Sequence, residues 1–256
     1  EGIVTNTLGT SNFVAGVNAG NSITSGGNYN TVVGDEAGTA ITTGDNNTAV
    51  GQDALKSTTT ADHNTAVGQA ALYTNTTGTT NTAVGRASMY ANTTGGANTA
   101  VGYAALNTNT TASNNTAVGY QSLQANTTGA GNVAVGRQAL LVNTTAGSNT
   151  ALGDQALNAN TTGASNTAVG SAALASNTTA SENTAVGLSA MISNTTGASN
   201  TAIGYQALIA NTTASDNTAT GFNALYTNTT GTLNVANGWR PLYANTTGNN
   251  NIAVGY

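Results

Sequence analysis

The residues whose types and spacing could carry chemistry are Asn-x-Thr triplets that recur at a fixed interval. Asn in such a triplet can accept an N-glycan if the chain passes through a glycosylating pathway, and the segment then lies on an exposed turn. The same residues also build turns, because Asn and Thr side chains hydrogen-bond to nearby backbone. We favour the turn and keep both interpretations. The possible N-glycosylation sites are Asn75, Asn92, Asn109, Asn126, Asn143, Asn160, Asn177, Asn194, Asn211, Asn228 and Asn245.

No catalytic or metal-binding constellation accompanies these triplets. His63 is the only histidine, the chain has no cysteine, and its nine acidic residues are scattered. A multi-histidine metal site or a histidine-based proton relay therefore lacks its partners. Glu182 and Asp216 occupy equivalent places two repeats apart, which indicates a duplicated pair of repeats rather than an acid pair. We predict no enzyme activity, no cofactor and no metal.

Composition limits the partners. Charged residues make up 5% of the chain and the net charge is −5. Four basic residues without a cluster cannot neutralise a phosphate backbone, so we expect no nucleic acid partner. No apolar run approaches the ~20 residues that cross a bilayer, so we expect no membrane insertion in this segment. Glu1 begins no visible signal peptide, which fits a mature product or an excised segment.

A single seventeen-residue unit, close to Asn-Thr-Ala-Val-Gly-x-x-Ala-Leu-x-x-Asn-Thr-Thr-Gly-x-x, carries almost all of these residues. Its first Asn recurs from Asn30 to Asn251 without a slip, and a degenerate copy one residue out of phase starts at Asn12. A fixed short period means that each unit stacks on the next. We therefore predict a degenerate N-terminal repeat region at 1–29 and tandem repeats at 30–256.

The unit predicts an all-β parallel β-solenoid, or β-roll, of about fifteen coils. Its Thr, Asn and Gly disfavour a helix, and seventeen residues leave room for two short strands and two turns. The recurrent Gly51 position suits a turn with positive φ, and a column of stacked Asn can satisfy turn backbone groups. Because other copies carry Val, Leu or Ile at the Thr48 and Val50 positions, we place that face of the strand in the interior, together with the Leu55 column.

An almost unvaried Ala column between Thr and Val is the main clue to assembly. Ala is a poor strand former, and an exposed strand position should accept many side chains. Yet the residue after Gly has drifted from Gln52 to Trp239 while Ala has not. Recent duplication could explain the sameness; otherwise the Ala face packs against another copy of the chain, which we favour, or against the opposite wall of the same coil. The possible interface residues are Ala49, Ala66, Ala83, Ala100, Ala117, Ala134, Ala151, Ala168, Ala185, Ala202, Ala219, Ala236 and Ala253.

Asn-Thr-Ala-Val-Gly followed three residues later by Ala or Ser, as in 115–122, resembles the head repeats of trimeric autotransporter adhesins and related repeats of bacterial and phage fibre proteins. The resemblance covers roughly 30–256. It implies a left-handed parallel β-roll, three chains per fibre and adhesion to host or matrix surfaces. This unit is longer than the family's, because it contains an inserted Asn-Thr-Thr-Gly segment.

We therefore expect a structural shaft or adhesive segment of an extracellular fibre, built from identical chains as a homotrimer or end to end, with surface glycans or matrix as possible partners. The alternative is a binding module, either a sugar-binding adhesin head or an ice-binding solenoid. Aromatic columns such as Tyr103 and Tyr120 could stack on sugars or partner chains, or only cover neighbouring coils. Thr76 and Thr77 would face opposite ways on a strand, which counts against an ice-binding array. The uncapped last coil, 251–256, predicts further stacking there.

Overall fold

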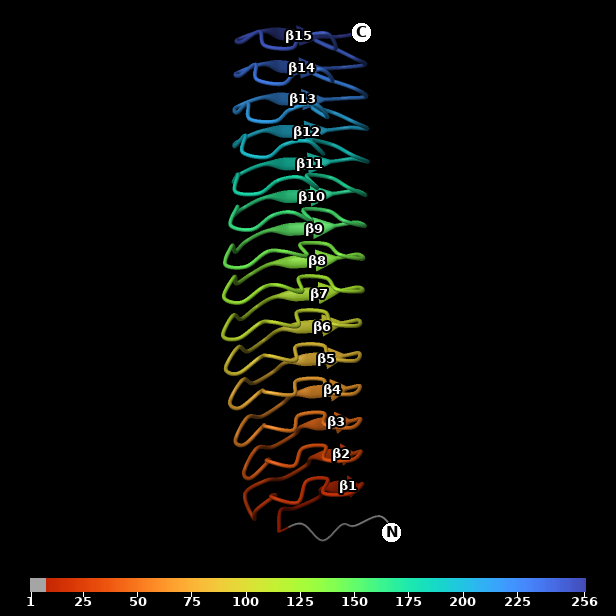
Figure 1. Cartoon of the computed structure of the whole chain (residues 1–256), viewed down its shortest axis with the longest axis vertical. Coiled ribbons are helices and arrows are strands. Elements are labelled where there is room, and N and C mark those ends of the chain that lie inside the picture. The colour runs from red at the N-terminus through yellow and green to blue at the C-terminus, as the bar shows by residue number, and fades with distance from the viewer. Residues whose placement is uncertain (1–7) are drawn as a thin grey trace. The chain divides into compact units, whose positions relative to one another are not determined.

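Residues 8–256, the part of the chain that the computed structural model describes, form fifteen three-residue strands and no helix (Figure 1). The chain divides into two compact units, Glu1–Ala130 and Gly131–Tyr256. The first unit holds β1 (Phe13–Ala15), β2 (Thr31–Val33), β3 (Thr48–Val50), β4 (Thr65–Val67), β5 (Thr82–Val84), β6 (Thr99–Val101) and β7 (Thr116–Val118). The second holds β8 (Val133–Val135), β9 (Thr150–Leu152), β10 (Thr167–Val169), β11 (Thr184–Val186), β12 (Thr201–Ile203), β13 (Thr218–Thr220), β14 (Val235–Asn237) and β15 (Ile252–Val254).

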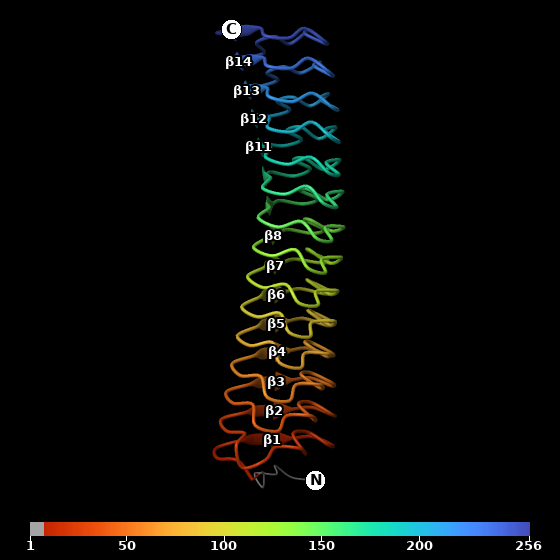
Figure 2. The same cartoon turned by 90° about the vertical axis from the view of Figure 1, so that its left-hand side faces the viewer.

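Within each unit, consecutive strands pair in parallel, and equivalent residues of neighbouring repeats lie side by side. Thr48 of β3 pairs with Thr65 of β4 in the first unit, and Thr167 of β10 pairs with Thr184 of β11 in the second. The degenerate first copy pairs one residue out of phase, with Phe13 opposite Thr31. Figures 1 and 2 show one turn of chain per strand in each unit. The predicted all-β parallel β-solenoid is confirmed, and the left-handed sense that the resemblance implies stays a prediction.

Each coil contains one strand where the sequence suggested two. The Gly-x-x-Ala-Leu segment is a series of turns in which φ is 129° at Gly170, 55° at Ala172 and 51° at Leu174. A left-handed conformation costs a residue other than Gly roughly 1–2 kcal/mol. Neighbouring coils hold these residues in place: the Ala172 N–H donates to the Asp154 carbonyl (2.9 Å), and the Leu174 N–H donates to the Ala190 carbonyl (3.0 Å). The turns are therefore stabilised by the stack and not by their own sequence.

Ala and Leu line the interior of each coil, whereas the strand Thr and Val face outward. Ala168 and Leu174 are fully buried, while Thr167 and Val169 on the other side of β10 are half-buried. The prediction that placed Thr and Val inside is therefore wrong, and the buried Leu column is confirmed. The physical reason is that a three-residue strand turns only its middle side chain inward, so β-branched residues occupy the two outward positions.

The first two described coils show what limits the size of the middle residue. There the Ala column carries Val14 and Val32, and glycine replaces Leu in the facing turn. A Cβ added at Gly38 would lie 3.1 Å from Val32 Cγ1 and 2.8 Å from Ile41 Cδ1. A larger strand residue is thus accommodated by a smaller residue across the coil, as close packing at constant volume requires. The Ala column packs against the opposite wall of its own coil.

Candidate functional surfaces

The thirteen Ala residues predicted at an interface lie inside single coils. Twelve of them are fully buried within one chain, and the last is half-buried in the final coil. A side chain that no other molecule can reach cannot form an interface, so that prediction is wrong for the twelve buried residues. The residues concerned are Ala49, Ala66, Ala83, Ala100, Ala117, Ala134, Ala151, Ala168, Ala185, Ala202, Ala219, Ala236 and Ala253.

The Asn residues of the Asn-x-Thr triplets are also interior. Ten have no exposed surface and Asn245 is half-buried. Asn177 is typical: its Nδ2 donates to Asn160 Oδ1 of the preceding coil (2.9 Å) and to the Ala180 carbonyl of its own turn (3.0 Å). An N-glycan would take the place of one of these hydrogens and would need space outside the coil. The folded chain therefore uses these residues as turn-forming ladders, the interpretation that the sequence favoured. The residues of this ladder are Asn75, Asn92, Asn109, Asn126, Asn143, Asn160, Asn177, Asn194, Asn211, Asn228 and Asn245.

A second Asn ladder runs beside the start of each strand. The backbone N–H of Asn166 donates to Asn149 Oδ1 (2.9 Å), and its Nδ2 donates to the Ala180 carbonyl (2.8 Å). The same carbonyl accepts from Asn177, so both ladders join the two ends of one coil at a single point. Buried amide groups whose hydrogen bonds are satisfied stabilise such a turn without any charge.

Three repeating columns of Thr differ in what their hydroxyls do. Thr76 Oγ1, in the first Thr column of the Asn-Thr-Thr segment, donates to the Thr93 carbonyl of the next coil (3.0 Å). Thr77, in the second column, is exposed. The outward strand Thr, such as Thr82, are half-exposed, and within residues 8–256 their hydroxyls make no hydrogen bond to protein. Sequence reasoning missed this last column because it placed the strand Thr in the interior.

Aromatic rings stack along the column that follows the strand Gly. In the second unit Tyr205, Phe222, Trp239 and Tyr256 form a continuous stack with centroid separations of 5.3, 6.0 and 4.8 Å and nearly parallel planes. Phe222 and Trp239 each have a ring on both sides, so they present their edges to solvent. Sugars stack on exposed ring faces, and this arrangement therefore counts against the sugar-binding alternative. The aromatic rings do cover neighbouring coils.

Arg240 extends this aromatic stack toward a second column. Its Cζ lies 5.1 Å from the Trp239 centroid and 3.9 Å from the Tyr243 centroid, and the Tyr243 ring stacks on Tyr226 at 4.9 Å. A guanidinium in these positions is attracted by both ring faces. The second unit therefore carries a largely apolar aromatic strip with one positive charge.

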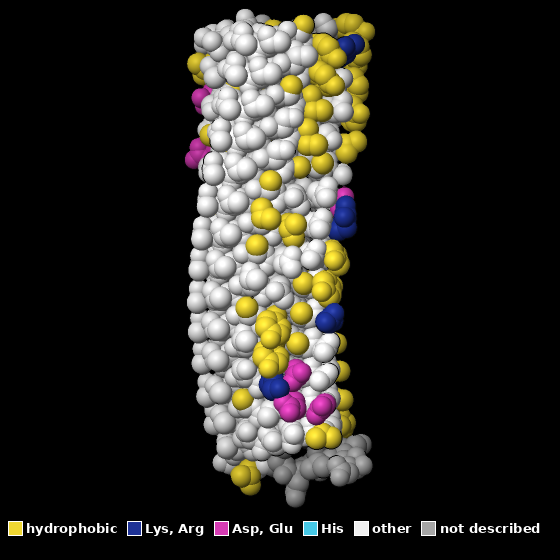
Figure 3. Space-filling model, viewed as in Figure 1, with side chains coloured by type: hydrophobic (Ala, Val, Ile, Leu, Met, Phe, Trp, Pro, Cys, Tyr) yellow, Lys and Arg dark blue, Asp and Glu magenta, His cyan; other side chains and the backbone are white. Residues whose placement is uncertain are grey.

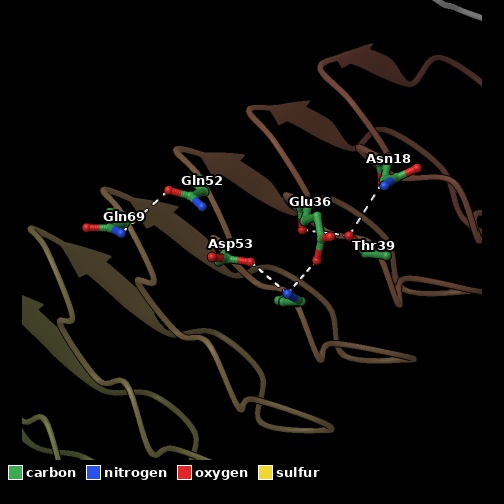
Figure 4. A network of polar contacts seen from close by, with 7 residues as sticks. Asn18, Glu36, Thr39, Gln52, Asp53 and Gln69 are labelled. Carbon is green, nitrogen blue, oxygen red and sulfur yellow. Dashed lines mark hydrogen bonds and ion pairs between the residues drawn. The ribbon is translucent and has the colours of Figure 1, made fainter.

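Charged side chains are few on the face shown in Figure 3, and most of that face is neither hydrophobic nor charged. The clearest polar cluster lies in the first unit, where Lys56 forms ion pairs with Glu36 of the preceding coil and with Asp53 (2.8 Å) (Figure 4). The hydrogen bonds to Asp53 and then to Glu36 raise the pKa of the Lys56 ammonium. Because the group is solvated, this cluster contributes little to stability.

Among residues 8–256 no three His, Cys, Asp or Glu side chains come together as a metal site. Within the same residues no helix could cross a bilayer. His63 lies at the exposed turn before Asn64, where its backbone N–H donates to the Asp45 carbonyl (3.0 Å). The surfaces with chemical character are therefore the outward strand face and the aromatic strip.

Comparison with protein-family models, with curated proteins and with solved structures found no match.

Proposed function

We propose that this chain is a structural segment of an extracellular fibre that forms by self-association of identical chains. The observation that carries the proposal is the residue-for-residue register of the coils. Within each unit, backbone groups, two Asn ladders and one Thr ladder are satisfied by neighbouring coils, as Asn177 and Thr76 illustrate. Such repetition produces length and a regular surface, which are the properties that a shaft needs.

The aromatic strip supports the self-association part of the proposal. Tyr205, Phe222 and Trp239 keep 42%, 42% and 43% of their surface exposed in the single chain. Aromatic residues and Arg are enriched in the buried centres of protein interfaces. Because the Ala column is interior, an assembly of identical chains must use outward residues of this kind. The resemblance to adhesin head repeats supports a homotrimer and an adhesive role toward surface glycans or matrix.

Light scattering coupled to size exclusion tests the proposal on the full chain. We expect a mass that is a multiple of the 25.0 kDa chain, 3 × 25.0 = 75 kDa for a homotrimer. Phe222→Lys, which places a charge within the aromatic stack, should lower the assembled mass. Ser171→Lys is the matched control, since Ser171 is exposed in the same column outside the stack. A folded wild-type chain that stays at 25.0 kDa at micromolar concentration would overturn the proposal.

A further inference from the structure

We propose that the outward face of β2–β7 binds ice. This face consists of two columns, one of Thr and one of Val, which are unvaried through six consecutive coils. The Thr column comprises Thr31, Thr48, Thr65, Thr82, Thr99 and Thr116. The Val column comprises Val33, Val50, Val67, Val84, Val101 and Val118. All twelve side chains are β-branched, uncharged and partly exposed.

The free hydroxyls of the Thr column are the first argument. A hydroxyl can donate one hydrogen bond and accept two. The six strand Thr hydroxyls form no hydrogen bond within residues 8–256. The hydroxyls of the neighbouring ladder, such as those of Thr76 and Thr93, instead donate to carbonyls of the next coil. A dry protein partner would have to satisfy every hydroxyl, because each one buried without a partner costs about 1–3 kcal/mol. An ice surface offers a water molecule to each.

The spacing of the columns is the second argument. Water in ice forms tetrahedral O–H···O bonds of about 2.75 Å, so second-neighbour oxygens lie about 4.5 Å apart. Paired strands lie about 4.8 Å apart, so the mismatch is about 0.3 Å per coil and about 1.5 Å after five steps. That sum is less than half of one ice repeat. Small rotations of the Thr and Val side chains can therefore keep the whole array near the lattice positions.

The apolar groups beside the hydroxyls are the third argument. Each Thr contributes a methyl group and each Val contributes two, in a sheet that fixes their positions. Water next to apolar groups loses orientational freedom, and a rigid periodic array imposes that restriction in a repeating pattern. No Asp, Glu, Lys or Arg occurs in either column, so no charge holds a competing hydration shell on the face. In the second unit the pattern is interrupted by Val133, Leu152 and Asn237, so the ice-binding face is confined to the first unit.

The test measures partition of the fluorescently labelled full chain into a growing ice hemisphere, together with thermal hysteresis. We expect the wild-type chain to be enriched in ice. Thr82→Lys, in the middle of the face, should lower thermal hysteresis about tenfold, because its long charged side chain interrupts the uncharged array. Thr94→Lys is the matched control, because Thr94 is exposed in the same unit but lies outside the strands. It should leave the hysteresis within about twofold of wild type, because both columns stay unchanged and an exposed substitution elsewhere has little effect.

Circular dichroism checks that both variants fold, and Thr82→Leu replaces Thr82→Lys if the charge prevents folding. Exclusion of the wild-type chain from ice, or equal losses in Thr82→Lys and Thr94→Lys, would overturn the proposal. Sizing of the same samples separates this result from the fibre proposal. A monomer that binds ice removes self-association alone, whereas an assembly that excludes ice and dissociates on Thr82→Lys shows that the face contacts another chain and removes ice binding alone.

Discussion

Asn177→Ala removes a side chain that links three successive coils of the second unit. Asn177 donates to Asn160 Oδ1 and to the Ala180 carbonyl, and its own Oδ1 accepts from Asn194 Nδ2 (3.0 Å). The Ala180 carbonyl keeps its second donor, Asn166. Asn160 Oδ1 and one N–H of Asn194 are left buried without a partner. At about 1–3 kcal/mol for each group, the substitution should cost about 2–6 kcal/mol of unfolding free energy.

Urea unfolding of the full chain, followed by circular dichroism at 25 °C, measures this loss. Ser176→Ala is the matched control: Ser176 is the preceding residue and is half-buried, and its hydroxyl makes no hydrogen bond within the described residues. It should change the free energy by no more than about 0.5 kcal/mol. The comparison is valid if the unfolding free energy falls with urea concentration at the same slope in both variants. A loss below about 1 kcal/mol for Asn177→Ala would refute the view that the Asn ladder stabilises the stack.

Four shorter predictions concern other residues of the two units. Ala168→Leu adds three carbon atoms to a fully buried site, so it should lower stability by about 1–3 kcal/mol or more in urea titrations, and a Tm equal to that of wild type would contradict the interior position. Ala172→Gly, at a φ of 55°, should raise the Tm because glycine adopts this conformation without strain, and a lower Tm would show that the stack removes the strain. Asn126 and its equivalents should carry no glycan, so intact-mass analysis of natively sourced chain should give the bare peptide mass, and several hexose-type additions would contradict the buried ladder. The ion pairs raise the pKa of Lys56, so their contribution to stability is present below the unfolded pKa, about 10.4, and is lost as pH rises through the folded pKa. NMR titration should find Lys56 still protonated at a pH where an unfolded lysine has lost its proton. A normal titration midpoint would contradict the ion pairs.

The solenoid could be predicted from the sequence because its signal is the period itself. The Leu55 column, the positive φ of Gly51 and the structural use of Asn all followed from residue type and spacing, and the structure confirms each of them. Asn75 illustrates the reason: an uncharged amide can stack coil upon coil without the repulsion that a repeated charge would cause.

Which face of the strand points into the coil could not be predicted from residue type. Thr48 and Val50 are the better strand formers and tolerate apolar substitutes, which suggested an interior face, yet a half-exposed strand surface favours the same residues. The distance between the two walls of the coil decides which strand residue fits inside. In the sequence, only the paired changes at Val32 and Gly38 indicate that distance. Leu55 in a left-handed conformation was equally hidden, because no local preference of Leu favours it.

The residue-for-residue register of the coils has a consequence for how this chain can change over generations. Removing or adding one whole seventeen-residue repeat, for example 167–183, brings together residues of the same types as those that already pair in neighbouring coils. Examples are Thr150 beside Thr167 and Thr167 beside Thr184. No new packing has to arise, and stability shifts by about one repeat and its contact with a neighbour. Tandem copies in a gene recombine readily with one another. The number of coils is therefore a quantity that mutation can adjust in single steps while leaving the fold of every remaining coil intact.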